Sequence, residues 1–112
     1  MTASAAAHLR RIDVAGKSTL GPIDQERPDL GYIRIAELVI DDRYQRPLTE
    51  AGWRTISRIA SDFRWSRFSP ALVAPLPDGR FAVIDGQHRI HAAAMRGIDK
   101  VPCMMVDIDL TE

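Results

Sequence analysis

The stretch "DGQHRIHAAAMRG", residues 85–97, decides the fold because it leads from an apolar run into an amphipathic helix. Ile90, Ala93, Ala94 and Gly97 recur at helical spacing, so this stripe is predicted to face a core. Gly97 suits the left-handed position that follows a helix. The polar first turn, residues 85–89, is therefore expected to face a ligand.

The start of this helix is the strongest candidate for a binding site. The first N–H groups of a helix have no partners inside it and carry partial positive charge. Gly86 would let a ligand approach the backbone, and His88 and Arg89 would meet a phosphate in the first turn. In the alternative interpretation, Asp85 only caps the helix, and His88 and Arg89 are solvated. The residue types alone leave both interpretations open.

Upstream of this helix, the pattern predicts a strand and a second helix. Residues 32–35 alternate like a short strand, and residues 36–40 form a single turn that leads into another extended stretch. A helix is expected over residues 50–62, with Thr49 as its N-cap. Its inward face is predicted to consist of Trp53, Ile56, Ile59, Ala60 and Phe63.

A hairpin and a last strand complete the predicted domain. Residues 71–76 and 80–84 are the hairpin strands around the turn "PDG", and Pro75 indicates an edge strand or irregular pairing. Residues 101–108, "VPCMMVDI", are expected to be a buried closing strand. The order of strand, helix, hairpin, helix and strand predicts a single α+β domain, a small mixed sheet with a hairpin and packed helices.

Composition limits the function classes. The chain has 112 residues, typical of one domain, and equal numbers of basic and acidic residues, so net charge gives no attraction to nucleic acid. A single cysteine excludes an internal disulfide, and His88 and His91 lack a third partner, so no metal site is predicted. No membrane span or secretory signal is evident, which favours a cytoplasmic protein. Residues 1–29 are expected to be an arm, flexible or ordered by a partner, before a domain over 30–112.

Three segments, in order, resemble the ParB/sulfiredoxin superfamily. "YQRPL" (44–48) resembles the first ParB box, and the hairpin at 71–86 resembles the segment that leads into the second box. Residues 86–106 resemble the second box and the helix that follows it, and "DGQHR" is a variant of the second box. The resemblance runs from about Tyr32 to Asp109 and implies a ParB/sulfiredoxin-like α+β fold.

The resemblance also implies a ligand. ParB domains bind CTP and sulfiredoxins bind ATP, so it implies a nucleotide-binding domain that takes CTP or ATP with Mg²⁺. Gly86, His88 and Arg89 match the phosphate-binding positions, and Gln45 and Arg46 would line the same cleft. Gln87 would hydrogen-bond the ligand rather than act as a base.

Two departures from the family pattern limit the expected chemistry. Gln87 stands where sulfiredoxin has its catalytic cysteine and ParB has a glutamate, so sulfiredoxin activity is not expected and nucleotide hydrolysis stays open. His91 replaces the third arginine of the motif, which weakens contacts to a triphosphate at neutral pH. No helix-turn-helix follows in this sequence, so the resemblance is to the N-terminal domain and not to a whole partition protein.

Two other function classes remain open. Residues 43–67 hold six arginines against Glu50 and Asp62, as a DNA-associated module or nuclease of phage or plasmid type would. A protein-interaction module that kept the fold and lost the ligand is the other alternative. A homodimer is compatible with either, and the family points to a bacterial or phage protein.

Overall fold

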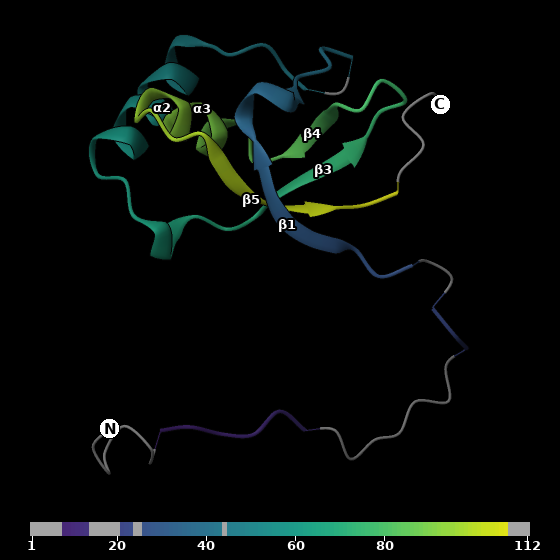
Figure 1. The fold of residues 1–112 in the computed structure, drawn as a ribbon. Helices are drawn as coiled ribbons and strands as arrows, with labels where there is room; N and C mark the ends of the chain where they lie inside the picture. The colour runs from purple at the N-terminus through teal and green to yellow at the C-terminus, as the bar shows by residue number, and fades with distance from the viewer. Residues whose placement is uncertain (1–7, 14–20, 24–25, 44, 108–112) are drawn as a thin grey trace.

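The computed structural model describes residues 8–13, 21–23, 26–43 and 45–107. Its mixed sheet has the strand order β1-β5-β3-β4-β2 (Figure 1). The strands are β1 (Asp29–Arg34), β2 (Leu38–Val39), β3 (Ala71–Pro75), β4 (Phe81–Asp85) and β5 (Lys100–Met105). The helices are α2 (Glu50–Ser61) and α3 (Gln87–Met95), with 3-10 turns η1 (Ile35–Glu37) and η2 (Trp65–Arg67). This arrangement confirms the predicted α+β class.

The sheet combines antiparallel and parallel pairs. β3 and β4 form the predicted hairpin, whose turn is closed by the Leu76 N–H donating to the Arg80 carbonyl at 2.8 Å. β1 pairs with β5 antiparallel, whereas β3–β5 and β2–β4 are parallel. Of the two alternatives predicted at Pro75, the edge strand is wrong, because β3 lies between β5 and β4, but the irregular pairing is confirmed, because the β5 pairing stops at Val73. Pro75 is tolerated because β5 pairs only with residues 71–73, so its missing N–H breaks no bond to β5.

The core forms where α3 packs on the sheet. Ile90 and Ala93 join the buried strand residues Val73, Val83 and Val101. The opposite face of α3 meets α2, where Ala92 packs with Ile56 and Ala60 (Figure 1). The predicted stripe is therefore wrong at Ala94 and Gly97, which are exposed, and it missed Ala92. The short helix lies between the sheet and α2, so it buries two faces rather than one.

The predicted inward face of α2 is wrong at Trp53. This side chain is 47% exposed, and its ring contacts His91 edge-on, with the centroids 5.4 Å apart. α2 packs on the short helix α3 rather than on the sheet, so a narrow stripe around Ile56 and Ala60 is enough to cover the contact. Phe63 packs instead against the sheet core.

The predicted helix ends are confirmed. The Thr49 hydroxyl accepts a hydrogen bond from the Gly52 N–H at 3.1 Å, so Thr49 is the N-cap of α2. Gly97 adopts a φ of 74°, and its N–H donates to the Ala94 carbonyl at 3.0 Å. The Ile98 N–H donates to the Ala93 carbonyl at 3.1 Å, which completes the six-to-one bond of a Schellman motif.

The N-terminal residues that the structure describes, up to Pro28, are exposed and belong to no helix or strand. The boundary between arm and domain stays a prediction. Tyr44 and Ile108, which the predicted box and last strand include, lie outside the described residues. No helix in the described ranges has the length and apolar character needed to cross a bilayer.

Candidate functional site

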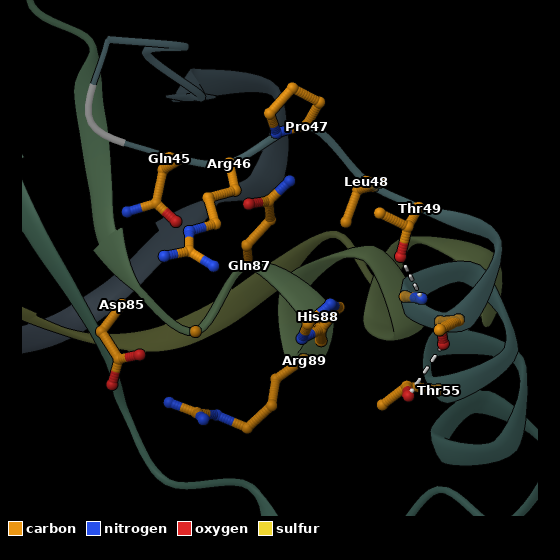
Figure 2. Close-up of a pocket in the computed structure, with 13 residues that line it drawn as sticks. Gln45, Arg46, Pro47, Leu48, Thr49, Thr55, Asp85, Gln87, His88 and Arg89 are labelled. Carbon is orange, nitrogen blue, oxygen red and sulfur yellow. Dashed lines mark hydrogen bonds between the residues drawn. The ribbon is translucent and has the colours of Figure 1, made fainter.

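A cavity of about 610 Å³ opens where α2 and α3 begin. Its walls come from the segment before α2, the first turns of both helices and the end of β4 (Figure 2). All six residues predicted for the binding site line it: Gln45, Arg46, Gly86, Gln87, His88 and Arg89. The structure therefore brings the two boxes together, although they are about forty positions apart in the sequence. Binding by these residues stays a prediction.

The first turn of α3 has no side-chain cap. Gly86 is the N-cap residue, with a φ of 105° and a ψ of 16°, and glycine has no side chain to accept a hydrogen bond. Among the described residues, no group accepts from the backbone N–H of Gln87, His88 or Arg89. The alternative that Asp85 caps this helix is wrong, because Gly86 is the N-cap residue and no side chain makes a cap hydrogen bond to α3. Three polarised N–H groups therefore remain available to an anion.

Gly86 is required by close packing as well as by its φ. A Cβ atom there would lie 3.1 Å from the Cβ of Ala71 and 3.0 Å from Nη2 of Arg89. Ala71 is fully buried at the start of β3, so this neighbour has little room to move. The glycine thus allows α3 to begin directly against the sheet.

Arg89 is held in place by contacts that leave its charge uncompensated. Its Nε donates to the Ser69 carbonyl at 3.2 Å, and the guanidinium carbon lies 6.0 Å from the centroid of the Phe68 ring. Within the described residues, neither Arg89 nor Arg46 has a carboxylate partner. Figure 2 shows both side chains extending toward the Asp85 side of the start of α3. Two permanent positive charges therefore flank the free N–H groups.

Gln45 links the first box to the sheet. Its Nε2 donates to the Ile84 carbonyl at 2.6 Å, across 39 positions of sequence. This bond fixes the segment that carries Arg46 beside the end of β4. The amide oxygen of Gln45 has no donor among the described residues, so it can accept from a ligand.

The two histidines of α3 lie in different environments. His88 lines the cavity, and its Nε2 would lie 3.3 Å from a Cβ added at Gly52. His91 does not line it and contacts Trp53 instead. Burial of the His91 ring, with a smaller contribution from the charge of His88, lowers the pKa of His91 below its ordinary value. The sequence predicted that His91 makes a weak contact to a triphosphate, but its side chain lies outside this cavity.

Sequence reasoning missed the wall that α2 contributes. Thr49, Ala51, Gly52 and Thr55 all line the cavity. The Thr55 hydroxyl donates to the Ala51 carbonyl at 3.1 Å, and the Thr49 hydroxyl accepts the cap bond from Gly52. The available signal was the N-cap at Thr49, which directly follows the first box and places the start of α2 beside it.

Most of the predicted basic flank over residues 43–67 is paired with carboxylates. The pairs are Arg43–Asp41, Arg54–Glu50, Arg64–Asp62 and Arg67–Asp62. Within the described part of the chain, Arg46 and Arg58 are the two arginines of this segment without such a partner. No three His, Cys, Asp or Glu side chains of the described residues gather as metal ligands would.

Comparisons with known proteins match this geometry. A profile of the ParB N-terminal domain matches residues 25–112. The chromosome-partitioning protein ParB from Caulobacter crescentus, complexed with CTP-gamma-S, is 27% identical with a TM-score of 0.58, over 73% of this chain and 46% of that one. Sulfiredoxin from Arabidopsis thaliana is 16% identical with a TM-score of 0.56, over 72% of this chain and 88% of that one.

A second structure of Caulobacter ParB, complexed to the centromeric parS site, is 23% identical with a TM-score of 0.58. That similarity covers 71% of this chain and 40% of the other, so the chain matches less than half the length of either ParB structure. No curated protein sequence matches the chain. Because the family profile spans most of the sequence, from residue 25 to residue 112, the chain belongs to the ParB N-terminal domain family.

Proposed function

We propose that the cavity binds a nucleoside triphosphate, with its phosphates at the first turn of α3. One observation carries the proposal: the cavity brings together the N–H groups of residues 87–89 and the guanidinium groups of Arg46 and Arg89, and none of these has a partner of opposite charge or an acceptor on the backbone side among the described residues, apart from the bond of Arg89 to Ser69. A helix start without a cap, flanked by permanent positive charge, is an arrangement that favours phosphate oxygens.

The size and lining of the cavity support a nucleotide rather than a lone phosphate. Its volume of about 610 Å³ falls within the range of small-molecule sites, roughly 300–1,000 Å³. Leu48, Pro47 and Ala51 supply an apolar wall beside the polar one. The ParB structure bound to CTP-gamma-S, 27% identical to this chain, supports a cytidine nucleotide as the first candidate.

The residues divide into distinct roles under this proposal. Arg46 and Arg89 bind phosphate oxygens, and the N–H groups of residues 87–89 complete their coordination. Gln45 and Gln87 donate or accept hydrogen bonds without changing charge. Asp85 is the one carboxylate in the lining, so a Mg²⁺ ion would take this ligand together with phosphate oxygens and water. A bound Mg²⁺ would offset the charge that the phosphates bring next to Asp85.

Hydrolysis of the bound nucleotide stays a separate prediction. The amide of Gln87 does not take up a proton at neutral pH, so it does not serve as a general base there. We therefore expect binding without rapid turnover.

Calorimetric titration with CTP, ATP, GTP and UTP, each with Mg²⁺, tests the proposal. We expect saturable binding of one nucleotide to the unmodified chain. Arg46→Ala should weaken this binding about tenfold or more, because hydrogen bonds to charged groups contribute about 1.5–3 kcal/mol. Arg46 is the sharper choice because, unlike Arg89, it makes no hydrogen bond to another described residue.

Arg80→Ala is the matched control, because it removes the same charge from an exposed side chain outside the cavity. It should leave the affinity unchanged. Absence of binding by any of the four nucleotides to the folded chain would overturn the proposal. Equal weakening in both variants would instead indicate non-specific attraction by net charge.

The DNA-associated module, the nuclease and the ligand-free interaction module stay predictions. The similarity to ParB on its parS site is at 23% identity and concerns the fold alone. The nucleotide titration separates the interaction module from the proposal, because such a module predicts no nucleotide response.

A further inference from the structure

A second cavity, of about 470 Å³, lies between the end of α2 and η2. It is lined by Arg58, Ile59, Asp62, Phe63, Arg64, Arg67, Phe68 and Arg89. Arg89 is the residue that this cavity shares with the first one. The other residues have no part in the proposed nucleotide site.

The charges of this lining are strongly unbalanced. Four of its side chains are arginines and one is an aspartate. Asp62 holds two of them, with its carboxylate oxygens 3.2 Å from Nε of Arg64 and 3.6 Å from Nη1 of Arg67. Arg58 has no carboxylate partner among the described residues. Since guanidinium groups stay charged at any physiological pH, the cavity has a fixed positive charge.

Phe63 and Phe68, which line the cavity, form an aromatic cluster with Trp65, which lies next to the lining. The Phe63 and Phe68 rings lie 5.8 Å apart, and Phe68 is buried in the core. Trp65 contacts both rings edge-on, with centroid distances of 5.0 Å to Phe63 and 5.4 Å to Phe68. Its side chain is 51% exposed, so an indole surface remains open to solvent while its contacts hold the ring in place.

We propose that this second cavity, together with Trp65, binds single-stranded nucleic acid. The phosphates would contact Arg58, Arg64 and Arg67, and a base would stack on Trp65. A positively charged groove beside an exposed aromatic ring matches what a single strand presents, since it carries both repeated phosphates and unpaired planar bases. An acidic peptide would satisfy the arginines but would leave the indole without a planar partner. A duplex keeps its bases stacked on one another.

Fluorescence anisotropy with a labelled oligothymidine tests this proposal on the full chain. We expect saturable binding that weakens with salt. Trp65→Ala should weaken it about fivefold or more, as alanine substitution at stacking positions does. Trp65→Phe, which keeps a ring, should recover part of the affinity. Circular dichroism of each variant establishes that it is folded.

The arginines have their own readout. Arg58→Ala should weaken binding and reduce the slope of log affinity against log salt by about 0.7, the value for one phosphate contact on a single strand. Arg80→Ala again serves as the control of equal charge. Arg46→Ala, which alters only the first cavity, should leave oligothymidine binding unchanged, so this test can fail independently of the proposed nucleotide site.

The proposal would be overturned by no binding of oligothymidine at low salt, by equal binding of a duplex of the same length, or by unchanged affinity in both Trp65→Ala and Arg58→Ala. Binding of polyglutamate as tight as that of oligothymidine would also contradict it, and would assign the cavity to an acidic peptide.

Discussion

Replacing Gly86 with alanine should destabilise the fold more than the same replacement at Gly79. Both glycines have positive φ, 105° at Gly86 and 89° at Gly79. An L-residue in this left-handed region costs about 1–2 kcal/mol at either position. The environments differ, because a Cβ at Gly79 would meet nothing within 4 Å, whereas one at Gly86 would lie 3.1 Å from the Cβ of buried Ala71.

The contact with Ala71 sets the size of the difference. Ala71 is held in β3, where it pairs with Cys103 of β5, so relief requires movement of the central strands. Overpacking of this kind costs about 1–3 kcal/mol. The second close atom, Nη2 of Arg89, is the end of a flexible side chain and can move. We therefore expect a total loss of about 2–5 kcal/mol for Gly86→Ala and about 1–2 kcal/mol for Gly79→Ala.

Urea unfolding followed by circular dichroism measures both losses. Small domains have a free energy of unfolding of about 5–15 kcal/mol, so both variants should still show a folded baseline at low urea in all but the least stable case. Equal losses for the two variants would refute the reasoning, because the strain from φ would then account for everything. A smaller loss at Gly86 than at Gly79 would show that the start of α3 does not pack against β3.

Three other predictions concern the helices. Ile56→Ala should lower the free energy of unfolding by about 2–5 kcal/mol in urea titrations, because Ile56 is fully buried between α2 and α3; a loss below about 1 kcal/mol would contradict this packing. Thr49→Ala should cost about 1 kcal/mol through loss of the cap bond, and Thr55→Ala, which removes a hydroxyl inside the helix, should cost less. Because burial lowers the pKa of His91, its NMR titration should have a midpoint below 6.5. His91 then binds a proton more tightly in the unfolded chain than in the folded one, so acid favours unfolding. The His91 contribution to stability should therefore be complete above pH 6.5 and decline as the pH falls through that value. His91→Gln should lack this dependence.

Much of the fold could be predicted from local signals. The Thr49 cap, the hairpin turn and Gly97 each depend on residues within a few positions, and all three are confirmed. The errors arose where a tertiary contact decides the outcome. Trp53 matched the helical period but is half-exposed, because the partner of α2 is a short helix rather than the sheet. Pro75 indicated an edge strand or irregular pairing, and only the structure decides between them, because β5 pairs with only part of β3.

In the candidate site, too, local signals were read correctly and a contact between helices was missed. The six predicted residues come together because the two boxes flank the end of β4, and the Gln45–Ile84 bond ties them there. The contribution of α2 was missed, because its place beside α3 follows from packing of Ile56 on Ala92. Sequence reasoning did not foresee that four of the six arginines of residues 43–67 form ion pairs, which they make with Asp41, Glu50 and Asp62 at two to five positions away.

The most direct test of the central claim is an amide NMR titration of the chain with CTP and Mg²⁺. If phosphates bind at the start of α3, the largest saturable shifts should be those of the N–H groups of Gln87, His88 and Arg89. In Arg46→Ala the same shifts should need about tenfold more nucleotide, or more, to reach half their full size. Saturable shifts confined to other segments, or no shifts at all, would contradict a phosphate site at this helix start.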